Sequence, residues 1–199
     1  MSASFASETR EGLRRQGWRL AVAPAGVTLA GLRAAGAPYK GHKYFAQQAR
    51  ETSEQPVQGG ELAYRPGLMP GSLNRPFQEA ARLAEGLSAR LPPGAVGAVG
   101  PAALYVWLLV DHQRRHGEWL LRQCFTWAAD PSGETHLAVG VFGQARPLIV
   151  SPVPELTGQG LGLMPLIVPA PEPGPDAAGA VNTRGAAETT PGGDTIHDG

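Results

Sequence analysis

Cationic and aromatic side chains are concentrated in one short stretch of the chain. It holds both lysines of the protein, a histidine, three aromatic rings and a glycine: Tyr39, Lys40, Gly41, His42, Lys43, Tyr44 and Phe45. Cations neutralise phosphates, and each base stacked on an aromatic ring contributes roughly 1–3 kcal/mol. The pattern therefore predicts contacts with single-stranded nucleic acid. The structural alternative is a surface loop whose aromatic rings pack into the protein's own core.

A second cluster of basic residues follows the apolar run of residues 101–110. We expect the arginines of this cluster to contact phosphates: Arg114, Arg115 and Arg122. On a helix, His112 and His116 share one face, as metal-binding histidines do. The spacing assigns no third ligand to that pair. Positive charge at the C-terminal end of a helix also stabilises the helix dipole without any ligand.

Signatures of catalysis are missing from the sequence. It has no Gly-x-Ser-x-Gly elbow, no Walker loop, no dinucleotide-binding fingerprint and no Cys-x-x-Cys pair. We expect the single cysteine, Cys124, to be a buried structural thiol. Four acids could gather around a divalent cation: Asp111, Glu118, Asp130 and Glu134. We expect a protein without cofactor or catalytic residue. A metal-dependent nuclease or hydrolase using His112 and His116 is an alternative function.

The charges of the 199-residue chain cancel overall but are unevenly distributed. Residues 1–150 hold 16 Lys and Arg against 11 Asp and Glu, whereas residues 151–199 hold one Arg and six acids. A basic body joined to an acidic segment is typical of a protein that binds polyanions, although a polar tail can also drift to one sign. Lysine, isoleucine and asparagine are scarce and Ala, Gly, Pro, Leu and Arg abundant, which indicates a GC-rich bacterial or phage genome.

Hydrophobic spacing and turn residues predict an α+β fold. We expect two helices, over residues 75–90 with Asn74 as N-cap and over residues 101–116, the latter favoured over a buried strand. Strands are predicted over 18–23, 27–32, 61–65, 119–128, 136–142 and 147–150, the first two forming a hairpin. The predicted architecture is an antiparallel sheet of five or six strands with both helices on one face. The four tryptophans are expected to fill its core, with Trp119 or Trp127 as the alternative exposed platform for base stacking.

The predicted domain organisation is a single body between two flexible ends. Residues 1–12 are expected to fray, residues 13–150 to form the globular α+β domain, and the Pro/Gly-rich acidic segment 151–199 to be mostly disordered. Within that segment, the apolar residues 158–168 stand apart from other predicted structure. No apolar run reaches the roughly 18–20 residues of a membrane span, and the N-terminus lacks the apolar core of a secretory signal. We therefore expect a cytoplasmic protein, associated with the nucleoid if it binds DNA.

These observations lead to one functional hypothesis and one rival from another class. The hypothesis is a non-catalytic DNA-binding accessory protein, acting on single strands or ends in bacterial DNA repair or the DNA damage response. The rival is a structural or interaction protein, such as a phage or envelope assembly factor, that docks through its C-terminal segment. The expected partners are DNA and a protein bound by the acidic tail, with no membrane. Homo-oligomerisation stays open.

Overall fold

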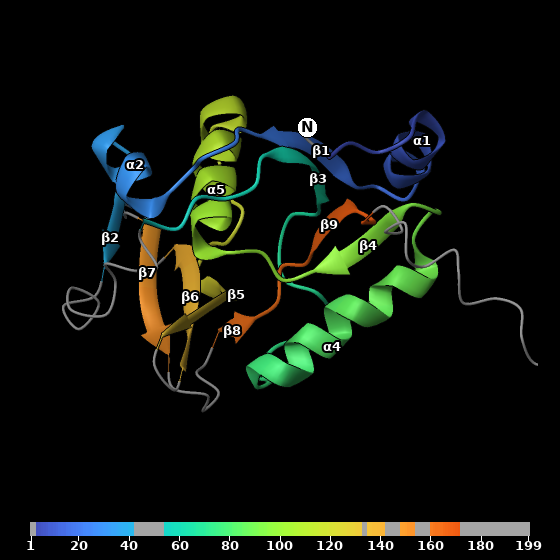
Figure 1. Cartoon of the computed structure of the whole chain (residues 1–199). Coiled ribbons are helices and arrows are strands. Elements are labelled where there is room, and N and C mark those ends of the chain that lie inside the picture. Colours follow the sequence, from blue (N-terminus) through green and yellow to red (C-terminus); the bar gives the residue numbers. More distant parts are fainter. Residues whose placement is uncertain (1–2, 42–53, 133–134, 142–147, 154–159, 172–199) are drawn as a thin grey trace, which may run out of the picture.

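Helix α5 (Ala102–His116) is the central element of the fold, and it packs against two β-sheets (Figure 1). The computed structural model describes residues 3–41, 54–132, 135–141, 148–153 and 160–171. Proline at position 101 and a left-handed Gly117, with φ of 73°, bound the helix. Most of its residues are buried, because apolar side chains cover nearly its whole circumference. The predicted helix over residues 101–116 is confirmed.

The first sheet is antiparallel and has the strand order β1-β3-β9-β4. These strands are β1 (Arg19–Ala23), β3 (Gly60–Tyr64), β9 (Leu166–Pro169) and β4 (Ala95–Ala98). Ala21, Leu62 and Leu166 belong to the same core cluster as the buried face of α5. On the opposite side, Trp18 and Ile167 form a separate cluster with Leu13 of helix α1 (Ser7–Arg15). Both faces of this sheet are therefore covered.

The second sheet is mixed and has the strand order β2-β7-β6-β5-β8. Its members are β2 (Tyr39–Gly41), β7 (Leu148–Val153), β6 (Thr135–Val141), β5 (Cys124–Ser132) and β8 (Leu161–Gly162). The central strands β5, β6 and β7 are antiparallel, while the edge strands β2 and β8 run parallel to their neighbours. Leu137 and Val139 join the α5 core cluster. Trp127 joins a separate cluster with Ala80 and Ala84, which belong to helix α4 (Phe77–Leu87).

Helix α4 (Phe77–Leu87), continued by the 3-10 helix η1 (Ser88–Arg90), packs against β4 as well as against Trp127. The approach to β4 is close: a Cβ added to Gly97 would lie 2.1 Å from the carbonyl oxygen of Ala84. The predicted helix over residues 75–90 is confirmed in this shorter form. Its predicted N-cap is wrong, since Asn74 has a φ of 58° and Pro76 takes the cap position without a side-chain hydrogen bond.

The two-sheet architecture corrects the prediction of one antiparallel sheet with both helices on one face. The class α+β and the strands around residues 61–65, 136–142 and 147–150 are confirmed. Residues 27–32, predicted to complete a hairpin, instead begin helix α2 (Leu29–Ala34), because the Thr28 hydroxyl accepts a hydrogen bond from the backbone N–H of Gly31. The predicted strand over 119–128 begins only at Cys124.

Both predicted flexible ends contain folded segments. Residues 7–12 belong to α1, with Phe5 buried just before it. Leu161–Gly162 and Leu166–Pro169 form β8 and β9, and of the three residues between them Leu163 and Met164 are fully buried. The prediction that residues 158–168 stand apart from the folded body is therefore wrong for most of that segment. Residues 172–199 lie outside the described part of the chain.

The tryptophans mostly follow their prediction as core residues. Trp18 and Trp127 are buried, which excludes Trp127 as an exposed stacking platform, and Trp107 and Trp119 pack against the α5 core while partly exposed. None of the helices among the described residues combines the length and apolar character that a membrane span requires.

Candidate nucleic-acid interface

The predicted nucleic-acid-binding residues come from three elements. Tyr39 and Lys40 begin β2, where the structure describes their backbone. Arg114 and Arg115 lie exposed in the last turn of α5, and Arg122 is exposed just before β5. The remaining predicted residues lie outside the described part of the chain: His42, Lys43, Tyr44 and Phe45.

The register of the second sheet places Tyr39 and Arg122 in one row. Tyr39 pairs with Leu148 of β7, Leu148 pairs with Val141 of β6, and a bridge joins Val141 to Arg122. Neighbouring strands lie about 4.8 Å apart, so the row from Arg122 to Tyr39 measures roughly 14 Å. Residues about 80 positions apart in the sequence thus meet at one end of the sheet.

The basic end of α5 is directed toward the same region. Its first residue, Ala102, contacts Asp130 far along β5, whereas Arg114 near its other end lines a small surface cavity of about 70 Å³. Ala35 and Ala37, which lead from α2 into β2, line the same cavity. Figure 1 shows α2 and β2 on the same side of α5. The structure therefore brings Arg114 close to residues 35–37, the segment that leads into β2.

Arginines at this end of the sheet differ in whether an acid neutralises them. Nε of Arg115 lies 2.9 Å from Oδ2 of Asp111, one turn earlier on α5. Among the described residues, no acid forms an ion pair with Arg114 or Arg122. At this end of the sheet, Arg114 and Arg122 are thus exposed cations that no ion pair within the described residues neutralises.

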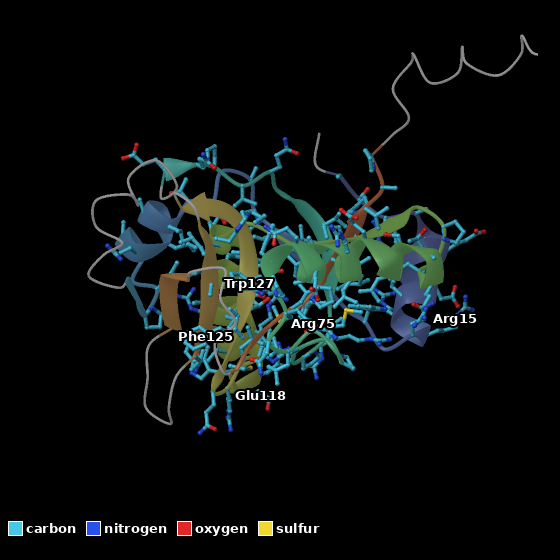
Figure 2. The ribbon with its side chains drawn as sticks, turned by 90° about the horizontal axis from the view of Figure 1, so that it is seen from below. Arg15, Arg75, Glu118, Phe125 and Trp127 are labelled. Atoms are coloured by element: carbon cyan, nitrogen blue, oxygen red, sulfur yellow. The ribbon has the colours of Figure 1, made fainter. Side chains whose placement is uncertain are left out.

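Other arginines lie elsewhere on the surface, so the positive charge is only partly gathered. Figure 2 shows Arg15 at the far side of the molecule from Glu118, which lies two residues after the end of α5. Arg15 pairs with Glu11 on α1, and Arg75, which lies just before α4, pairs with Glu79 in the first turn of that helix. These arginines contribute little to a face at the end of α5.

His112 lies inside the protein at this end of α5. Its side chain is 1% exposed, and its Nδ1 lies 2.9 Å from the hydroxyl oxygen of Tyr64 on β3. The ring of His116 stands 4.3 Å away between centroids, tilted by 38°. Burial lowers the pKa of His112, and the positive charges of His116 and Arg19 add to that effect. Sequence reasoning missed the Tyr64 contact, because nothing in the chain's spacing pairs residues 64 and 112.

The geometry around His112 does not form a metal centre. No group of three or more His, Cys, Asp or Glu able to hold a metal is present within the described residues. Nδ1 of His112 is engaged by the Tyr64 hydroxyl, so this nitrogen is not available to a metal. Asp130, one of the acids considered as a metal ligand, instead accepts a hydrogen bond from the backbone N–H of Ala102.

Cys124, a candidate from the sequence, and a second cavity are also described by the structure. The thiol of Cys124 is half-buried, and burial raises its pKa, which agrees with a structural role. A larger cavity of about 700 Å³ opens where residues 3–4 meet the end of β9, and Glu61 lies on its wall. That carboxylate already accepts hydrogen bonds from the Phe5 backbone and from Arg10, so it is not available to a ligand.

No family model, curated protein or solved structure matches this chain. The class that the fold defines is therefore an α+β protein in which one buried helix packs against two sheets. Its candidate site is the end of the second sheet where β2 starts.

Proposed function

We propose that this chain is a non-catalytic protein that binds single-stranded DNA through its β2-end face, defined as Tyr39, Lys40, Arg114 and Arg122. The observation that carries the proposal is the sheet register, which aligns Tyr39 with Arg122 while Arg114 lines a cavity at the entrance to β2. Residues 42–45 follow this point directly in the sequence and add two aromatic rings, a lysine and a histidine.

The chemistry of the face suits a flexible anionic strand. Arg114 and Arg122 can each neutralise a phosphate, and tyrosine can stack on a base. The row of roughly 14 Å matches about four nucleotides at 3.4 Å each. A role in bacterial DNA repair or the damage response is the cellular context that we hypothesise, motivated by the GC-rich residue usage and by the absence of enzyme motifs.

The interaction-protein rival has two docking elements, the apolar segment 158–168 and the Pro-rich tail, and burial argues against most of the first. Residues 161–167 are buried among the sheets, so they are not free to bind a partner. A role for residues 172–199 in recruiting a protein partner remains a hypothesis of its own, and pull-down with the full chain and with a variant lacking those residues tests it.

The DNA-binding proposal is tested by fluorescence anisotropy with the full chain. The probe is a labelled oligothymidine of about 20 nucleotides, longer than a typical 4–16-nucleotide site. Affinity should fall steeply between about 50 and about 200 mM NaCl. In the double variant Arg114→Ala/Arg122→Ala, the negative slope of log affinity against log salt should become shallower by about 1.4. At about 50 mM salt this corresponds to roughly tenfold weaker binding for each arginine removed.

The matched control is Arg14→Ala/Arg82→Ala, which removes two exposed arginines of α1 and α4 that form no ion pair among the described residues. This variant should retain wild-type affinity and slope. Absence of binding at 50 mM salt, or equal losses in the two double variants, overturns the proposal.

A further inference from the structure

The hydrogen bond between His112 and Tyr64 connects the end of α5 to the first sheet. The donor and acceptor atoms are 2.9 Å apart, and the two rings meet edge to face with their centroids 5.9 Å apart. Tyr64 is 5% exposed and His112 is 1% exposed, so water competes little for this bond. The contact holds the last turns of α5 against β3.

The other ring nitrogen of His112 has no hydrogen-bond partner among the described residues. Nε2 is buried, and the nearest carboxylate oxygen, Oε1 of Glu118, lies 3.8 Å away, beyond hydrogen-bond distance. Glu118 is 57% exposed at its side chain, which weakens its attraction for a charge on His112. In the doubly protonated ring, the Nε2 N–H would therefore have no acceptor within hydrogen-bond distance among the described residues.

Most charged groups around His112 oppose its protonation. From β1, Arg19 is positive and also interacts with Tyr64 of β3. From α5 itself, His116 stands 4.3 Å away, and Asp111 is occupied by Arg115. From the chain after α5, only Glu118 favours the charge. Burial and two neighbouring cations outweigh one solvated carboxylate.

The last turn of α5 lies at an exposed end of the helix. The helix stops at Gly117, whose left-handed φ of 73° suits glycine, and the backbone N–H of Gly117 closes the last turn on the carbonyl of Gln113 at 2.8 Å. Residues 114–118 are exposed. Displacing this turn would hydrate His112 and separate it from Arg19 without opening the core around Leu108 and Leu109.

We propose that His112 is a pH-sensitive lock, in which its neutral ring holds the C-terminal turn of α5 against β1 and β3 and its protonation releases that turn. The inference goes beyond DNA binding and stands or falls independently of it. Since Arg114 and Arg115 belong to the released turn, the lock would also make the position of the basic side chains depend on pH.

The lock is tested by hydrogen exchange of the full chain without nucleic acid, with rates corrected for the intrinsic effect of pH. Between about pH 7.5 and about pH 5, on either side of the histidine range, protection of the Gly117 amide should fall at least tenfold. Amides of α4, which contains no histidine, should keep their protection.

Two variants separate the lock from general acid sensitivity. His112→Gln cannot titrate, so protection of the Gly117 amide should no longer depend on pH. His116→Gln removes one repelling cation from the surroundings of His112. Release of the turn should therefore persist, with its midpoint shifted to higher pH, toward the ordinary histidine value. If His112→Gln fails to fold, an NMR titration of the His112 ring in the wild type replaces it, and its midpoint must coincide with the loss of Gly117 protection. Unchanged wild-type protection at both pH values, or the same loss in His112→Gln, overturns the proposal.

Discussion

The carboxylate of Asp130 supplies the N-terminal cap that α5 lacks in its own sequence. Pro101 occupies the cap position and provides no side-chain hydrogen bond. Oδ2 of Asp130, on β5, instead accepts a hydrogen bond from the backbone N–H of Ala102. Asp130 is 7% exposed and Ala102 is fully buried, so water cannot replace the lost acceptor if the carboxylate is removed.

Asp130→Ala should lower the free energy of unfolding by about 2–3 kcal/mol. Loss of a cap costs roughly 1 kcal/mol, and leaving a buried N–H without a partner costs about 1–3 kcal/mol. Both costs refer to the same lost hydrogen bond, so they do not add. Urea unfolding followed by far-UV circular dichroism measures the change. The control is Glu79→Ala, which removes an exposed ion pair with Arg75 and should cost less than about 0.5 kcal/mol.

The pH dependence gives this prediction a second, sharper test. Burial raises the pKa of Asp130 above its ordinary 3.8. The folded state therefore holds the proton more tightly than the unfolded state, and the contribution of Asp130 to stability is greatest below pH 3.8 and declines as pH rises through the folded pKa. Asp130→Asn keeps an acceptor oxygen but cannot titrate. The stability of the wild type relative to Asp130→Asn should therefore fall from about pH 3 to about pH 6. A flat or rising difference would refute the argument.

Two glycines give paired predictions of opposite sign. Gly97→Ala should destabilise the protein by about 1–3 kcal/mol, because the new methyl group would lie 2.1 Å from the carbonyl oxygen of Ala84 and force α4 away from β4. Gly86→Ala, inside α4 with open space around the site, should stabilise it by up to about 0.5–1 kcal/mol through helix propensity. Thermal unfolding of both variants measures the shifts. A Gly97→Ala protein as stable as Gly86→Ala would contradict the packing described for β4.

The elements that sequence reasoning found are those whose signals are local. Helix α4 shows apolar residues at helical spacing, and α5 has proline before it and glycine after it. The β5–β6 hairpin carries its turn signal between its own strands. In contrast, the residues of β9 pair with β3 and β4, which lie about 70 to 100 positions earlier in the chain. No local pattern reveals such a pairing, so residues 158–168 resembled an isolated apolar segment.

The properties of the candidate site also separate into those that local sequence predicts and those that long-range contacts determine. Exposure of Arg114 and Arg122 follows from their polarity, and their position near Tyr39 follows only from the sheet register. His112 was singled out for its spacing from His116, but the decisive neighbour is Tyr64, 48 residues away. Spacing along one helix could identify a shared face. It could not show that His112 on this face is buried against Tyr64 while His116 stays exposed.

The two ends of α5 respond to acid in opposite directions. Asp130 at the first end has a raised pKa, so its protonation favours the folded state. His112 at the other end has a pKa lowered from 6.5. The contribution of His112 to stability is therefore present above pH 6.5 and is lost as pH falls through the folded pKa. Global unfolding of the wild type therefore reports the difference between two opposed effects. Replacing Asp130 by Asn should leave stability that declines more steeply on acidification below about pH 6.5, while replacing His112 by Gln should leave stability that declines less. If the two single variants shift the pH profile in the same direction, burial of these two groups is not what sets the acid response of this helix.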